Sequence, residues 1–190
     1  ANTIDGLTTG VVTASISETD ASTLATVTDA NGNNDYTATI TTASVDASVF
    51  NGISNVIANL TDGGVTTLTE TAADFAEVNT ALTGGVLNGN EAVTITGDIT
   101  AVNVSTILNN TSGVVTATIS SDTAANLNSN LTNTSGNDAL TLTVTNTPTD
   151  AADLVALNGK TNQQINLSAV TVISGDASEL IDVYVTNIAD

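Results

Sequence analysis

The stretch VTATISSDTAANLNSNL, residues 115–131, contains the pattern that decides the fold. Val115, Ala117 and Ile119 alternate with hydroxyl residues, which is typical of a strand with one buried and one solvent-facing side. Thr123 then starts a segment with apolar residues at helical spacing, Leu127 and Leu131. The stretch therefore predicts a strand that is followed closely by a short helix.

The helix-start pattern recurs along the whole chain at intervals of about 26 residues. Each copy has Asp or Thr, then Ala, and then apolar residues on one helical face. The Asp or Thr side chain can accept a hydrogen bond from the free N–H groups of the first helical turn. The copies are DASTLATV (20–27), DASVFNGI (46–53), TAADFAEV (71–78), TAVNVSTI (100–107), TAANLNSNL (123–131), DAADLVAL (150–157) and DASELIDV (176–183).

An alternating strand pattern precedes each of these helix starts. Strands that are joined through a helix run parallel, and one such unit is too small to bury its own apolar side. The strand segments are VTASIS (12–17), YTATIT (36–41), VTTLT (65–69), VTITG (93–97), VTATIS (115–120), LTLTVT (140–145) and AVTVIS (169–174).

A larger repeat of about 52 residues joins these units in pairs. Copies one, three and five are followed by similar loops, here called the odd loops: NGNNDYT (31–37), NGNEAVT (88–94) and SGNDALT (135–141). We therefore predict that residues 1–190 form a single parallel β-solenoid of about seven strand–helix coils, with no separate globular domain. Neither end of the pattern carries a cap, so we expect either a segment of a longer array or a subunit that stacks end to end.

The composition excludes many functions. The chain has 20 acidic residues against one basic residue and a net charge of −19, with no His and no Cys. One base cannot neutralise a row of phosphates, which excludes nucleic-acid binding. Without His or Cys there is no Ser–His or Cys–His nucleophile, no zinc or haem site and no disulfide. The stretch at residues 99–121 carries no charge, but Thr, Ser and Asn interrupt it throughout, so we expect no membrane span.

The odd loops are candidate calcium sites, because Ca²⁺ prefers carboxylate and carbonyl oxygens. The alternative is that their Gly and Asn residues only form tight turns. The candidate ligands are Asn33, Asp35, Asn90, Glu91, Asn137 and Asp138.

The threonines of the strands are a second candidate site, because on parallel strands about 4.8 Å apart they would form a flat ladder of hydroxyl and methyl groups. Such Thr-x-Thr ladders resemble those of ice-binding β-solenoids. The alternative is that Thr is simply well suited to the wet face of a sheet. The ladder residues are Thr37, Thr39, Thr94, Thr96, Thr116, Thr118, Thr141 and Thr143.

The acids do not indicate an enzyme. Asp20, Asp46, Asp150 and Asp176 recur at equivalent helix starts, so their repetition favours a structural role. A pair of catalytic carboxylates would have to break that register. We therefore predict no catalytic residues and no enzymatic activity.

The repeat sequences resemble repeats of giant Thr/Ala/Asp-rich cell-surface proteins of bacteria, notably marine cyanobacteria. The segments that carry the resemblance are DAADLVALNGKT (150–161), VTTLTETAADFAEV (65–78) and GNEAVTITG (89–97). The resemblance implies secretion, a solenoid, and a place in a surface layer, adhesin stalk or extracellular filament. The expected partners are copies of the chain or flanking repeats, end to end. The alternative function is a module that uses its Thr ladder to bind ice or a carbohydrate surface.

Overall fold

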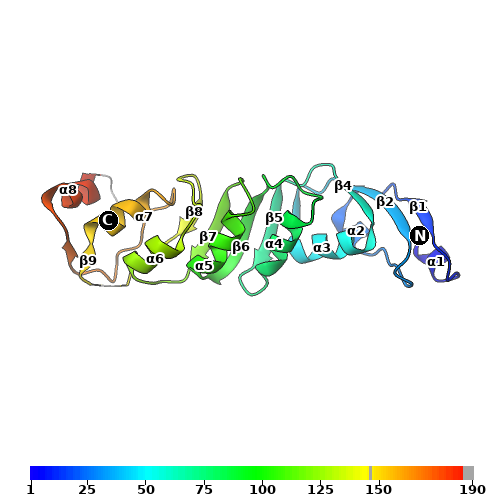
Figure 1. Ribbon diagram of the computed structural model, residues 1–190, viewed down its shortest axis with the longest axis horizontal. Coiled ribbons are helices and arrows are strands. Elements are labelled where there is room, and N and C mark those ends of the chain that lie inside the picture. Colours follow the sequence, from blue (N-terminus) through cyan, green and yellow to red (C-terminus); the bar gives the residue numbers. More distant parts are fainter. Residues whose placement is uncertain (146, 186–190) are drawn as a thin grey trace.

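The computed structural model describes residues 1–145 and 147–185. This part of the chain is an elongated α/β structure, with α1 and β1 at one end and α8 at the other (Figure 1). Its helices are α1 (Asn2–Asp5), α2 (Ala21–Leu24), α3 (Ala47–Val56), α4 (Ala76–Thr83), α5 (Ala101–Leu108), α6 (Ala124–Asn130), α7 (Ala151–Asn158) and α8 (Ala177–Val185). Its strands are β1 (Thr13–Ser15), β2 (Asp35–Ile40), β3 (Ser44–Asp46), β4 (Asn59–Asp62), β5 (Thr67–Thr71), β6 (Ala92–Ile99), β7 (Val115–Ile119), β8 (Ala139–Thr141), β9 (Thr149–Asp150) and β10 (Ile173–Ser174).

The helices begin where the repeated Asp or Thr predicts, and the capping hydrogen bonds are present. Asp46 accepts from the N–H of Val49, and Thr123 accepts from the N–H of Asn126. The third copy differs, because Thr71 accepts from the N–H of Asp74 at 3.3 Å but α4 starts only at Ala76. The helix-start prediction is therefore confirmed at the capped copies and displaced by one turn at α4.

The predicted single solenoid of seven stacked coils is wrong. The strands divide among three separate sheets, with the orders β1-β2-β4, β3-β5-β6-β7-β8 and β10-β9. Every pairing between these strands is parallel. The structure therefore has sheets of three, five and two strands in place of the predicted single ladder with one strand per repeat.

The first break between sheets lies at the turn after β4. The repeat around residues 59–71 supplies two strands, β4 beside β2 and β5 beside β3, and β6 then pairs with β5 and not with β4. Asp62 Oδ1 accepts from the N–H groups of Gly64 and Val65, which holds this turn. A Cβ on Gly63 would lie 2.5 Å from the methyl group of Thr39, so the close approach requires glycine. The chain therefore leaves one sheet and enters the next within a few residues.

The second break follows β8. Between β8 and β9 the described residues form only isolated bridges, Asp122 with Val144 and Thr143 with Asn166. The predicted strand at residues 169–174 is reduced to the two residues of β10, which pair with β9. Pro148 has no N–H to donate next to β9, and Pro is therefore unfavourable inside a continuous ladder. The third sheet is consequently short.

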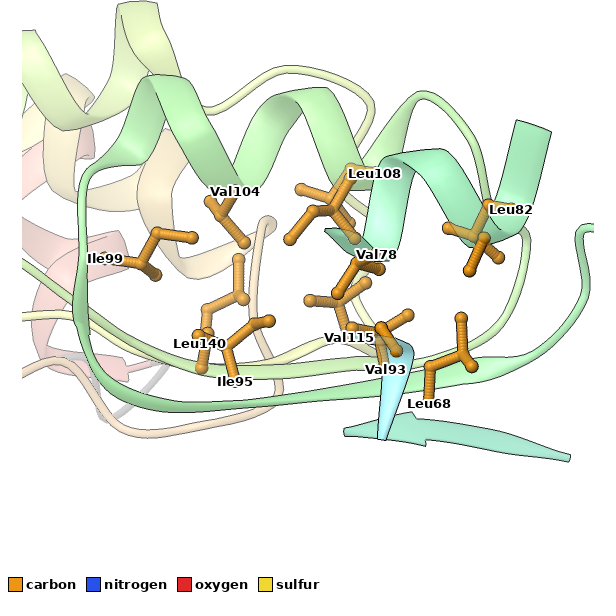
Figure 2. Packing of buried hydrophobic residues seen from close by; sticks show 14 of the residues in the cluster. Leu68, Val78, Leu82, Val93, Ile95, Ile99, Val104, Leu108, Val115 and Leu140 are labelled. Carbon is orange, nitrogen blue, oxygen red and sulfur yellow. The ribbon is translucent and has the colours of Figure 1, made fainter. Parts of the chain in front are cut away.

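The hydrophobic core lies between the sheets and the row of helices that covers them. Val93, Val115 and Leu140 are fully buried and point from neighbouring strands toward Val78 and Val104 on the helices (Figure 2). The burial of β7 alternates strictly along the strand, as its aliphatic and hydroxyl pattern predicts. Consecutive helices from α2 to α8 contact one another along the long axis.

Candidate functional site

Three buried polar side chains occupy the same position in the odd loops. When the loops are aligned on their glycines, Asn34, Glu91 and Asp138 are equivalent. Their exposed fractions are 7 %, 1 % and 2 %. The sequence prediction selected the exposed Asp35 in the first loop and missed Asn34, which the alignment on Gly32 would have found.

Two of these side chains join the loop to the strand before it. Asn34 Oδ1 accepts from the N–H of Val12 at 2.8 Å, and Asp138 Oδ1 accepts from the N–H of Val115 at 2.9 Å. Asp138 Oδ2 also accepts from the N–H of Ser135 at 2.7 Å, which closes its own turn. These side chains satisfy backbone groups that the parallel ladder leaves unpaired.

Glu91 departs from this arrangement. Its Oε1 accepts from the N–H of Asn88 at 2.9 Å, but its buried Oε2 has no hydrogen-bond partner among the described residues. The strand register places Thr66 opposite Glu91, and the N–H of Thr66 already donates to the carbonyl of Ala43. The donor that Val12 and Val115 supply in the other repeats is therefore missing. A buried acceptor without a partner costs about 1–3 kcal/mol.

The candidate calcium ligands form three separate pairs. Each pair lies in its own loop, and β7 separates the β6 and β8 loops within their sheet. Asp35 accepts from Asn59 Nδ2, Asn33 Nδ2 lies 3.5 Å from the carbonyl oxygen of Thr9, and the carbonyl of Asn137 accepts from Asn162. Asn90 and Glu91 directly precede β6 in the sequence. Within residues 1–145 and 147–185, no group of three acidic side chains is placed to hold a metal ion.

The threonine ladder is formed in part. Thr94 lies between Thr69 and Thr116 in the register of β5, β6 and β7, and Thr118 lies beside Thr141. Gly97 then adopts a positive φ of 85°, and the register shifts so that Asp98, not Thr96, faces Thr118. Thr37 and Thr39 belong to the other sheet, and Thr143 follows β8. The eight threonines therefore form short rows, interrupted by an acid, and no single flat lattice.

A buried polar cluster near the N-terminal end was not predicted from the sequence. Asp5 is 2 % exposed; its Oδ2 accepts from the N–H of Ala30 and its Oδ1 from Asn34 Nδ2. The same amide nitrogen lies 2.9 Å from Asp29 Oδ1 and 3.0 Å from the hydroxyl of Tyr36. Burial and the two nearby carboxylates raise the pKa of Tyr36. The cluster ties α1 to the first odd loop across residues that are far apart in sequence.

This cluster predicts a pH dependence of stability. The hydrogen bonds from Ala30 and then Asn34 lower the pKa of Asp5 below its ordinary value of 3.8. Because the folded-state pKa is the lower one, the stabilisation is fully present above about pH 5 and is lost as the pH falls through the folded value. We expect Asp5→Asn to lower the melting temperature at pH 6, and the difference from the wild type to shrink below about pH 4. A pH-independent difference would contradict this role, and the exposed Asp98, as Asp98→Asn, is the control.

Comparison with known proteins finds no matching protein family, no similar curated protein and no solved structure of similar fold. No helix of the described segments is both long enough and apolar enough to cross a membrane.

Proposed function

We propose that this chain is a structural module of a secreted bacterial surface protein or extracellular filament, and that it associates end to end. The observation that carries the proposal is where the exposed large hydrophobic side chains lie. Three of them, Ile4, Leu7 and Val11, are at one end of the structure. Four others are toward the opposite end, Val172 just before β10 and Ile181, Tyr184 and Val185 in α8, which Figure 1 shows at that end. The remaining exposed large hydrophobic side chains of the described residues lie between the two ends: Val49, Val102 and Val114.

Charge supports the same geometry of association. A net charge of −19 with one base makes the long sides of two molecules repel each other. Contact between the apolar ends is the most favourable contact in free energy, because it removes apolar surface from water. The secreted location rests on the resemblance of the repeats to those of bacterial cell-surface proteins. The proposal assigns no catalytic step.

Sedimentation velocity over a concentration series tests this function. Repulsion between acidic molecules is screened by salt, with a Debye length of about 8 Å at physiological ionic strength. We therefore expect an open-ended series of larger species that grows with protein and salt concentration. A single monomeric species at every concentration and ionic strength would contradict end-to-end association.

A further inference from the structure

The two larger sheets are joined by two short chain segments that are bonded to each other. Residues 41–43 lead from β2 to β3, and residues 63–66 lead from β4 to β5. We call them the crossing segments. The carbonyl of Ala43 accepts from the N–H groups of Thr66 at 2.8 Å and Thr67 at 3.0 Å, and from Thr66 Oγ1 at 3.1 Å. A carbonyl oxygen has two lone pairs, so three donors exceed what it can accept in good geometry.

An acceptor without a donor faces the same residue from the other side. The register of β5 and β6 places Thr66 opposite Glu91, whose buried Oε2 has no hydrogen-bond partner within the described part of the chain. The carbonyl of Thr66 already points to β6, because it accepts from the N–H of Ala92 at 2.9 Å. One acceptor at this junction is therefore overloaded, and the other is empty.

The first repeat shows the arrangement in which the buried acceptor has its donor. The carbonyl of Val12 accepts from the N–H of Asp35 at 3.0 Å, and the N–H of Val12 donates to Asn34 Oδ1 at 2.8 Å. Thr66 makes the corresponding carbonyl bond with β6, and only its N–H points elsewhere. A bond from the N–H of Thr66 to Glu91 is thus the arrangement of the repeat in which the buried side chain is satisfied.

We propose that the junction of the two larger sheets is a hinge, at which the N–H of Thr66 exchanges between the carbonyl of Ala43 and Glu91 Oε2. In the second state Ala43 keeps the N–H of Thr67, and Glu91 gains the donor that it lacks. Because the exchange releases a bond between the crossing segments, it allows the two sheets to move apart, as hinges at a few loop residues do.

The layer of helices determines the side on which this hinge opens. The sheets are interrupted at the junction, but the helices are not, because α3 contacts both α2 and α4. The molecule therefore bends about its helix side and opens on its sheet side. This inference is independent of end-to-end association, because it concerns motion within one molecule.

NMR relaxation dispersion of the full chain tests the exchange, because it detects motion on the microsecond to millisecond scale. We expect exchange broadening at the amides of both crossing segments, with one common rate constant. The amide of Val115 is the control and should show none, since its N–H already donates to the side chain of the equivalent odd loop. Glu91→Gln should abolish the exchange, because the amide oxygen serves Asn88 and the NH2 group cannot accept from Thr66.

A second variant changes the crowded acceptor at an exposed position. Thr66→Val removes the hydroxyl donor from the carbonyl of Ala43, so it should favour the bond to Ala43 and reduce the exchange broadening. Absence of exchange at Thr66 in the wild type, or undiminished exchange in Glu91→Gln, would overturn the inference. Exchange at Thr66 that leaves residues 41–43 unaffected would show the rotation of a single peptide group and would overturn the hinge.

Discussion

Gly113→Ala should destabilise the protein by about 3 kcal/mol or more, the upper part of the usual range for overpacking. The added Cβ would lie 2.3 Å from the carbonyl oxygen of Glu91 and 2.6 Å from that of Asn90. Both atoms belong to backbone that is fixed by the start of β6, so no flexible side chain can move aside. Chemical denaturation of the variant and the wild type measures the effect as a lower midpoint at an unchanged slope.

Gly52→Ala is the matched control, because the same methyl group meets no atom within 4 Å there. Gly52 lies in α3, where Ala is the better helix former by about 0.8–1 kcal/mol. We expect this variant to be slightly more stable than the wild type. Equal midpoints for Gly113→Ala and the wild type would show that residues 88–91 do not pack against residues 111–113 as described.

Leu140→Ala should cost about 2–5 kcal/mol of folding free energy. Leu140 is fully buried and lies in β8 under the helices, among the side chains in Figure 2. Truncation leaves a cavity between sheet and helix, and rigid neighbours on β7 fill it poorly. The loss of stability is measured as a lower melting temperature by far-UV circular dichroism. We expect both proteins to unfold cooperatively.

Val102→Ala controls for the loss of an aliphatic side chain without burial. Val102 lies in α5 and is 55 % exposed. Its replacement should change stability by no more than about 0.5 kcal/mol. If Leu140→Ala were as mild as Val102→Ala, the helices would not cover the sheet at this position.

Local signals in the sequence predicted the elements well. The cap residues Asp46 and Thr123 work through hydrogen bonds within one turn, so they act regardless of the surrounding fold. The alternation in residues 115–119 likewise separates a buried face from a wet face in the structure. Parallel pairing followed from the helix between successive strands.

The arrangement of the sheets was not predictable from the same signals. The regular repeat spacing implied one strand per repeat, but residues 44–71 contribute three strands, with α3 between β3 and β4 and a short turn between β4 and β5. At the turn between β4 and β5, Gly63 lies so close to Thr39, a residue distant in sequence, that a Cβ on Gly63 would lie 2.5 Å from the Thr39 methyl group. The sequence repeats show that a strand–helix unit recurs. Which strands pair with one another depends on tertiary contacts such as this close approach.

The buried polar side chains of the odd loops could likewise be predicted only in part from the sequence. Asn34, Glu91 and Asp138 share a loop position that the repeat alignment contains, but their roles depend on a donor from the preceding strand. That donor is present opposite Asn34 and Asp138 and absent opposite Glu91, because Thr66 is already bonded to Ala43. The Asp5 cluster is a further case, since it joins Asp5 to Ala30 and Asn34 without any motif around Asp5.

Electron microscopy of the full chain over a range of protein and salt concentrations tests end-to-end association most directly. We predict filaments one molecule wide at high protein and salt concentration, where repulsion between the acidic chains is screened. Isolated short rods at every protein and salt concentration would contradict end-to-end association.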